Sequence, residues 1–189
     1  VKNDNVLRLT MLFHDMGKPV MKTTDENGRD HFKGHAIASE QIAKTVMKRL
    51  KFDNDTIRKV TKLVAYHDYR MEPTGANVRR AMHEIGAELF PYYLAVRLAD
   101  TKAQSSYERR GKLENIIQIR ELYRNALRNK ECVTLKDLAV TGTDLINLGI
   151  APGKKLGTLL NELLDMVIED PAWNQKGKLC DYVKERFGF

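Results

Sequence analysis

Apolar residues recur at helical spacing along most of this chain, and two of these patterns run into an ionisable residue. One stripe consists of Ile57, Val60 and Val64. Another consists of Leu89, Tyr92 or Tyr93, and Val96. The position that follows is His67 in the first stripe and Asp100 in the second. Because an unpaired buried carboxylate is costly, such an inward group must find a cation, a hydrogen-bond donor or a proton.

The spacing of apolar residues predicts helices along most of the chain and no extended sheet. Residues 5–14 read as an apolar helix that stops at Gly17 and Pro19, and residues 20–34 as a loop or short hairpin with a turn at Asn27-Gly28. The next helix is predicted over residues 35–50, and its stripe is Ala38, Ile42, Val46 and Leu50. Asp53 and Thr74 are predicted to cap later helices. Since no long segment alternates with period two, the expected fold is all-α, a helical bundle followed by a smaller helical domain.

The composition changes after Lys130. A long helix is predicted over about 105–130. The expected domains are residues 1–104, a linking basic segment 105–132 that contains this helix, and residues 133–189. In the last segment Thr143 is predicted to cap a brief helix, and Asp170-Pro171 to end a longer one. The core stripe expected for that longer helix is Leu156, Leu159, Leu160, Leu163 and Val167. The final helix is expected to carry Leu179, Tyr182, Val183 and Phe187.

Composition narrows the class of protein. The two cysteines, Cys132 and Cys180, lie far apart, and the longest apolar runs are far shorter than the ~20 residues of a membrane helix. We therefore expect a cytoplasmic protein without a disulfide scaffold. The net charge of +7 fits a polyanionic partner. Residues 104–130 hold seven Lys/Arg against three Asp/Glu, and Arg120, Arg124 and Arg128 lie four apart, on one helix face.

His14-Asp15, His35, His67 and Asp100 form a candidate metal site. Adjacent residues of a helix point about 100° apart, so His14 and Asp15 can share an ion only near a helix end, which Gly17 and Pro19 provide. Nitrogen and oxygen ligands without cysteine suit Mg²⁺, Mn²⁺, Ni²⁺ or Fe better than structural zinc. The chemistry of such a site is metal-assisted hydrolysis of a phosphate ester.

Two further residues have predicted roles at this site, and two histidines have none. Lys18 is placed to contact a phosphate, and Asp68 to orient His67. His31 is expected in a loop and His83 facing solvent. An alternative stays open, because a single inward histidine or aspartate is usually satisfied by hydrogen bonds within a helical core.

The order HD … H … H … D is similar to that of the HD phosphohydrolase superfamily. The words LRLTMLFHDMGKP, HFKGHAIASEQIAKTVMKRLKF, VTKLVAYHD and AVRLADTKAQ closely resemble the HD domain of bacterial CCA-adding tRNA nucleotidyltransferases, of the poly(A) polymerase family. The segment LAVTGTDLINLGIAPGKKLGTLLNELLDMVIEDP resembles the RNA-binding region of the same family. The resemblance covers essentially the whole chain.

This resemblance implies that residues 1–104 are an HD domain and residues 133–189 bind tRNA. The nucleotidyltransferase head of that family lies N-terminal and is absent here, as is the first histidine of the HD pattern. The chain begins with Val1, which fits a piece of a longer protein. Independently, the helix expected to start at Pro152-Gly153 offers free N–H groups beside Lys154 and Lys155, a candidate phosphate seat.

Three functions follow as hypotheses. The first is a binding module, the HD and tRNA-binding portion of a tRNA nucleotidyltransferase, which recognises the phosphate backbone of tRNA. The second is a metal-dependent phosphohydrolase that acts on phosphate esters or 2′,3′-cyclic phosphates. The third is a relic scaffold, in which His67 and Asp100 only hydrogen-bond inside the core.

Overall fold

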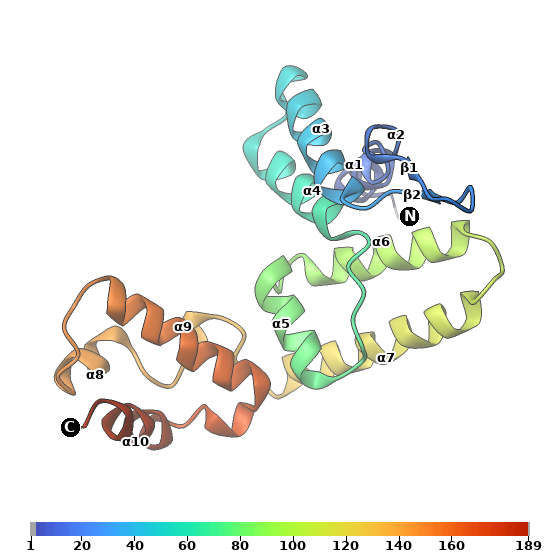
Figure 1. The fold of residues 1–189 in the computed structure, drawn as a ribbon. Coiled ribbons are helices and arrows are strands. Elements are labelled where there is room, and N and C mark those ends of the chain that lie inside the picture. The colour runs from blue at the N-terminus through green and yellow to red at the C-terminus, as the bar shows by residue number, and fades with distance from the viewer. Residues whose placement is uncertain (1–2, 189) are drawn as a thin grey trace. The chain divides into compact units, whose positions relative to one another are not determined.

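The computed structural model describes residues 3–188, and they are mostly helical, as the periodicity predicts (Figure 1). They group into two compact units, one formed by Val1–Met71 and Ile85–Gln118, the other by Glu72–Glu84 and Ile119–Phe189. The expected segments 1–104, 105–132 and 133–189 divide the chain differently and stay predictions. Val1 lies outside the described residues. Within residues 3–188, no helix combines the length and the apolar character that crossing a bilayer requires.

The first unit is a helical bundle with a small hairpin. Its elements are α1 (Asn5–Phe13), α2 (Lys18–Met21), β1 (Thr23–Thr24), β2 (Asp30–His31), α3 (His35–Arg49), α4 (Asn54–Tyr66), α6 (Phe90–Ala103) and the first half of α7 (Arg109–Arg128). Helix α3 packs along α4, and α1 contacts α3, α4 and α6. The shared core consists of Phe13, Ala43, Met47, Ile57, Val60 and Val64. The stripe predicted for α4 is therefore confirmed.

The core face of α3 lies one residue further along than predicted. Its buried residues are Ser39, Ala43 and Met47. The predicted stripe is half-buried at Ala38, Ile42 and Val46, and Leu50 is 59% exposed. The physical reason is close packing: the hydroxyl of Ser39 accepts a hydrogen bond from the backbone N–H of Gly17 at 2.8 Å, so a small polar residue holds a core position.

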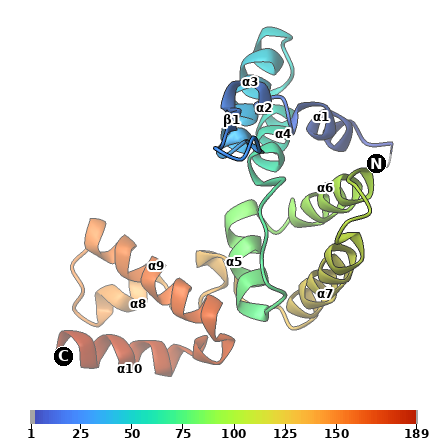
Figure 2. The same cartoon turned by 45° about the vertical axis from the view of Figure 1, so that its right-hand side comes forward.

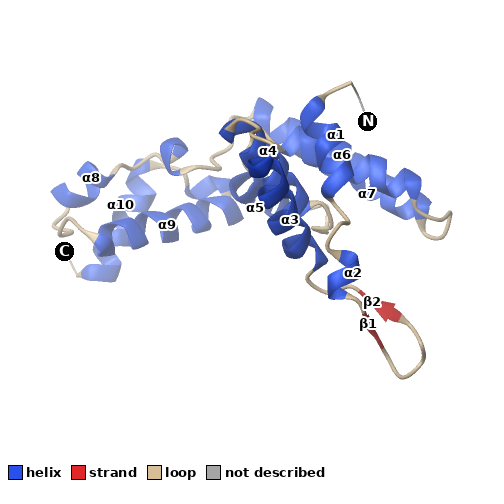
Figure 3. Ribbon diagram, turned by 90° about the horizontal axis from the view of Figure 1, so that it is seen from above, coloured by secondary structure: helices blue, strands red, loops and turns tan. Residues whose placement is uncertain are grey.

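Residues 18–31 connect α1 to α3. Pro19 stands in the first turn of α2, where a missing N–H costs nothing. Of the two structures predicted for residues 20–34, a loop or a short hairpin, the hairpin is confirmed, because β1 pairs antiparallel with β2 and Thr23 is the partner of His31 (Figure 3). Gly28 takes a φ of +74° in the turn, which is favourable only for glycine. The predicted N-cap Asp53 is also confirmed, since its side chain accepts from the N–H of Thr56.

The second unit is built around α9. Its elements are α5 (Gly75–Ile85, the last residue excepted), the second half of α7, η1 (Leu135–Asp137), α8 (Gly142–Asn147), α9 (Lys154–Glu169), η2 (Pro171–Trp173) and α10 (Lys176–Phe187). Helices α9 and α10 lie side by side (Figures 1 and 2). The core includes Leu145, Leu159, Leu163, Leu164, Val167, Leu179 and Val183. The predicted positions Leu156, Leu160 and Tyr182 are only partly buried, and Phe187 is exposed.

Two caps organise this unit. The cap of α8 is Thr141, and the predicted Thr143 is wrong, because Thr141 and Asp144 form a reciprocal capping box. The end of α9 at Asp170 is confirmed.

Arg79 of α5 donates to the last carbonyls of α9, those of Ile168 at 2.7 Å and Glu169 at 2.9 Å. These bonds tie α5 to α9 although the two helices are distant in sequence.

Candidate metal centre

Four of the five predicted ligands lie at helix ends of the first unit or next to them, and the fifth lies within a helix. His14 is the C-cap of α1, and Asp15 follows it in the turn. His35 opens α3, and His67 is the C-cap of α4. Asp100 is the exception, lying in the last turns of α6. A helix end leaves the side chain free to turn toward a neighbouring element, so four separate segments contribute to one site.

The three imidazoles are held in the same way. The Nδ1 atom of each ring contacts the backbone carbonyl three residues earlier: His14 with Met11 at 2.8 Å, His35 with Phe32 at 2.9 Å and His67 with Val64 at 2.7 Å. A carbonyl only accepts, so each Nδ1 carries the proton in this arrangement. In a neutral ring, Nε2 is then an acceptor with a free lone pair. Such a backbone contact to the other ring nitrogen is typical of metal-binding histidines.

Asp15, His35 and His67 meet in a triangle of ligand atoms. The two Nε2 atoms of His35 and His67 lie 3.1 Å apart, and they lie 3.5 Å and 3.6 Å from Oδ1 of Asp15. Two ligands each ~2.1 Å from an ion stand roughly 3.0 Å apart at a right angle and roughly 3.4 Å apart at the tetrahedral angle. The residues therefore fit a single divalent ion.

Two facing lone pairs repel each other unless a cation or a proton lies between them. His67 resists being the group that takes a proton, because burial lowers its pKa, and the neighbouring His14 and His35 lower it further. Its side chain is only 3% exposed, so water does little to relieve the contact. The facing Nε2 atoms of His35 and His67 are thus placed to share a cation, either a metal ion or a proton.

His14 and Asp100 border the triangle. Nε2 of His14 lies 3.3 Å from Oδ2 of Asp15 and 3.8 Å from Oδ1 of Asp100. Although 3.8 Å is longer than a hydrogen bond, interaction with Asp100 raises the pKa of His14, against the desolvation that lowers it. The pKa of Asp100 is lowered in return, chiefly by His14. The structure therefore places all five predicted ligands within one site.

Of the two residues predicted to assist the metal site, Lys18 lies at the site and Asp68 does not hold His67. Nζ of Lys18 lies 2.6 Å from Oδ2 of Asp15, at the edge of the site, where it is 40% exposed. Asp68 does not orient His67 as predicted, because the carbonyl of Val64 holds that ring and the Asp68 carboxylate pairs with Arg70. Of the other two histidines, His83 is exposed as predicted, whereas His31, expected in a loop, lies in strand β2, where it pairs with Asp25.

Several residues position the ligands and were not predicted. Tyr93 and Arg97 of α6 donate to the carbonyl of Tyr69 at 2.7 Å and 2.8 Å, which holds the segment after His67 against α6. Burial raises the pKa of Tyr93 to about 12, so its hydroxyl stays a donor. Gln104 donates to Oδ2 of Asp100 at 2.8 Å. Gln104 follows Asp100 by one helical turn, so this contact was readable from the sequence.

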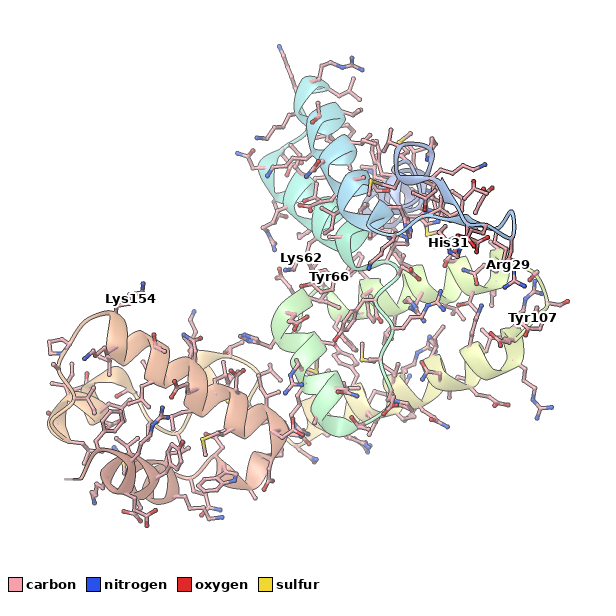
Figure 4. All side chains as sticks on the ribbon, in the orientation of Figure 1. Arg29, His31, Lys62, Tyr66, Tyr107 and Lys154 are labelled. Atoms are coloured by element: carbon pink, nitrogen blue, oxygen red, sulfur yellow. The ribbon has the colours of Figure 1, made fainter. Side chains whose placement is uncertain are left out.

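A cavity of about 660 Å³ opens onto these groups. It is lined by Asp15, His35, His67 and Asp100 together with Lys18 and by rings that include Tyr66 and Tyr69. Tyr66 lies at the end of α4, one turn after Lys62, whose Nζ stands 4.8 Å from its ring centroid (Figure 4). The cavity is large enough for a nucleotide-sized molecule.

The predicted RNA-binding residues lie in the second unit. Arg120, Arg124 and Arg128 all lie on α7, with Arg120 half-buried and the other two exposed. Arg124 pairs with Glu121, and Arg128 contacts Asn125. Helix α9 begins at Lys154, so Lys154 and Lys155 occupy its first turn, and the side chain of Lys154 projects away from the helix (Figure 4).

Fold and site together define an all-α protein with a histidine–carboxylate cluster. Residues 35–183 match the family described as tRNA nucleotidyltransferase domain 2, and the chain belongs to that family. The match includes residues of both units.

A curated relative agrees with this family. The CC-adding tRNA nucleotidyltransferase of Thermus thermophilus is 29% identical to the chain over 168 residues. The aligned region covers 86% of this chain, and it spans about a third (36%) of that relative's length. No solved structure matches the chain.

Proposed function

We propose that this chain is the HD and tRNA-binding portion of a tRNA nucleotidyltransferase that acts at the 3′ end of tRNA. The observation that carries the proposal is the family match over residues 35–183. The relative from Thermus thermophilus is a CC-adding enzyme by name, which supports tRNA as the partner. Nucleotide addition itself belongs to the whole protein, since the chain spans about a third (36%) of that relative.

The start of α9 supports a phosphate contact. A helix N-terminus carries a partial positive charge, so acidic residues stabilise it and lysines do not. Helix α9 has no acidic residue in its first turn, no side-chain cap on its Gly153 N-cap, and Lys154 and Lys155 at its first two positions. Both lysines are exposed. A phosphate group would relieve this repulsion and bond to the free N–H groups.

Charge reversal tests the proposal. We expect Lys154→Glu/Lys155→Glu to weaken binding of an unmodified tRNA transcript about tenfold or more in a filter or fluorescence titration, because two cationic contacts become repulsive. Lys44→Glu/Lys48→Glu is the matched control, since it makes the same charge change on exposed positions of α3. Equal weakening by both double variants would show that only the net charge matters and would contradict a specific seat at α9.

A second candidate function is a metal-dependent phosphohydrolase acting on phosphate esters or 2′,3′-cyclic phosphates. The facing Nε2 atoms of His35 and His67, 3.1 Å apart, favour it. Asp15, His35 and His67 would hold Mn²⁺, Ni²⁺, Fe or Mg²⁺, with His14 and Asp100 beside them. A bound ion of this kind lowers the pKa of a water and neutralises phosphate charge. Lys18 would orient a phosphate oxygen at the rim of the site.

Metal content and turnover decide between this candidate and a relic scaffold. We expect the purified protein to retain a transition metal by elemental analysis and to hydrolyse bis-p-nitrophenyl phosphate with Mn²⁺ or Ni²⁺. His35→Gln and His67→Gln should each weaken Mn²⁺ binding at least about 100-fold, while His31→Gln, in the exposed hairpin, leaves it unchanged. A protein without metal or turnover, in which Asp100→Ala alters only stability, would establish the scaffold instead.

A further inference from the structure

A second cavity in the first unit has no role in the functions proposed above. It measures about 540 Å³ and shares one lining residue, Arg70, with the cavity of the candidate metal centre. Three cations line it, Arg70, Arg97 and Lys112, against one carboxylate, Glu108. All these residues lie between the end of α4 and the first half of α7. The cavity is therefore lined mainly by cations, and it adjoins the metal-site cavity at Arg70.

The cations keep their charge available to a ligand. Arg97 donates to a backbone carbonyl, that of Tyr69, and Lys112 donates to the side-chain carbonyl of Gln104 at 3.1 Å. Both acceptors are neutral. Arg70 pairs with Asp68 at 3.1 Å, but its side chain is 65% exposed, and an exposed ion pair is weak enough to exchange for a phosphate. A guanidinium also offers several donors at once, which suits phosphate oxygens.

Gln104 connects the two cavities. Its Nε2 donates to Asp100 of the metal site at 2.8 Å, and its Oε1 accepts from Lys112 of the second cavity. Tyr69 connects the two cavities as well. It lines the metal-site cavity, and its backbone carbonyl accepts a hydrogen bond from Arg97, which lines the second cavity. Tyr66 and Tyr69 both line the metal-site cavity, and aromatic residues at a nucleotide site can stack on a nucleobase. Two neighbouring phosphate positions and a base position fit a nucleotide that carries a phosphate on each side of its sugar.

We propose that the second cavity is a subsite for a neighbouring phosphate, so that the metal site takes a nucleotide phosphorylated on both sides rather than a simple phosphate monoester. This inference rests on the phosphohydrolase candidate for the position of the first phosphate. The nucleotide could be free or stand at the end of an RNA strand, since the two share the recognised chemistry.

Calorimetric titration of the full chain tests the subsite. We expect adenosine 3′,5′-bisphosphate to bind about tenfold more tightly than adenosine 3′-monophosphate, because it adds charge-assisted contacts to Arg70 and Lys112. The double variant Arg70→Ala/Lys112→Ala should abolish this preference, so that the two nucleotides bind the variant with equal affinity. The control, Lys44→Ala/Arg49→Ala, removes two exposed cations of α3 that line neither cavity and should retain the preference.

The outcomes separate the subsite from the phosphohydrolase. The titrations are run with Mn²⁺ and with a chelator, and turnover is measured separately. A preference for the bisphosphate without turnover supports the subsite and removes the hydrolase. Equal affinity for both nucleotides, absence of bisphosphate binding, or equal loss for both nucleotides in the double variant would overturn the subsite even if turnover is present. A 5′-phosphorylated adenylate dinucleotide with a 3′-phosphate distinguishes the sources, because tighter binding than the bisphosphate indicates an RNA strand.

Discussion

At the scale of single residues, Gly17 sets the distance between the turn after α1 and the first turn of α3. A Cβ built on Gly17 would lie 2.4 Å from the carbonyl oxygen of His35 and 2.6 Å from the backbone nitrogen of Ser39. Both are backbone atoms, which cannot rotate away. Since Asp15 lies in the same turn and His35 is itself a candidate ligand, this glycine affects the geometry of the metal site as well as packing.

We predict that Gly17→Ala destabilises the protein by about 1–3 kcal/mol or more, because the added methyl group overpacks a backbone contact. Urea unfolding measures this change, and Mn²⁺ titration should show weaker binding in the same variant. Gly111→Ala is the control, since nothing lies within 4 Å of its Cβ. We expect it to be neutral or stabilising by up to about 1 kcal/mol. Equal stability of the two variants would contradict the tight contact.

At the scale of elements, α8 depends on one carboxylate. Asp144 accepts from the backbone and side chain of Thr141 at 2.8 Å each and pairs with Lys176 of α10 at 2.6 Å. These contacts lower the pKa of Asp144 to about 2, with Lys176 the largest cause. A carboxyl whose folded pKa is depressed contributes stability above its unfolded pKa, and this contribution is lost as the pH falls through the folded value.

We therefore predict that Asp144→Asn lowers stability at pH 7 and that the difference from the native chain shrinks between about pH 4 and about pH 2. Urea midpoints over this pH range measure it. Asp165→Asn removes an exposed carboxylate of α9 and serves as the comparison, with little expected effect at any pH. A constant difference between Asp144→Asn and the native chain down to about pH 2 would mean that the ionised form contributes nothing.

The end of α9 depends on a buried ion pair. Arg79 pairs with Glu131 at 2.8 Å, and their side chains are 8% and 16% exposed. Removing one partner leaves an uncompensated buried charge, which costs about 3–5 kcal/mol. We predict a loss of this size for Arg79→Met by chemical unfolding, and a smaller total loss for Arg79→Met/Glu131→Met than the sum of the two single changes. Arg80→Met, at an exposed pair, should cost less than about 1 kcal/mol.

These elements show what a single sequence can predict. The stripe of α4 and the inward position of His67 followed from local spacing, and so did the Asp53 cap. The core face of α3 was misplaced because Ser39 is polar, and its burial depends on Gly17, 22 positions away. The contact between Arg79 and α9 spans 89 positions and has no local signature. The cap of α8 does have a local signature, because Thr141 and Asp144 have the three-residue spacing of a capping box, which Thr143 lacks.

The same limit applies to the candidate metal centre. Residue type identified His14, Asp15, His35, His67 and Asp100, because each is a strong ligand in an apolar or helix-end context. What residue type could not supply is the tautomer. The carbonyls of Met11, Phe32 and Val64 fix it, and every residue has a carbonyl, so only the folded backbone shows which of them lies within reach.

At the scale of the whole molecule, the net charge of +7 bears on how the chain meets tRNA. Cations that contact phosphates release counterions, so the logarithm of the affinity falls linearly with the logarithm of the salt concentration. The slope is about −0.7 to −0.9 per phosphate contact for single and double strands. We predict a steep salt dependence for tRNA binding by the full chain, measured by titration at several salt concentrations.

The basic face of α7 should account for part of that slope. Arg124→Gln/Arg128→Gln removes two exposed cations, and we expect the slope to become shallower by about one to two units, because each lost phosphate contact removes just under one. Arg58→Gln provides the control, since Arg58 is an exposed arginine of α4 that lies outside the basic face of α7, and its loss should leave the slope unchanged. If the native chain and both variants show the same salt dependence of tRNA binding, α7 does not contact the tRNA backbone. Its arginines then form only a solvated helix face.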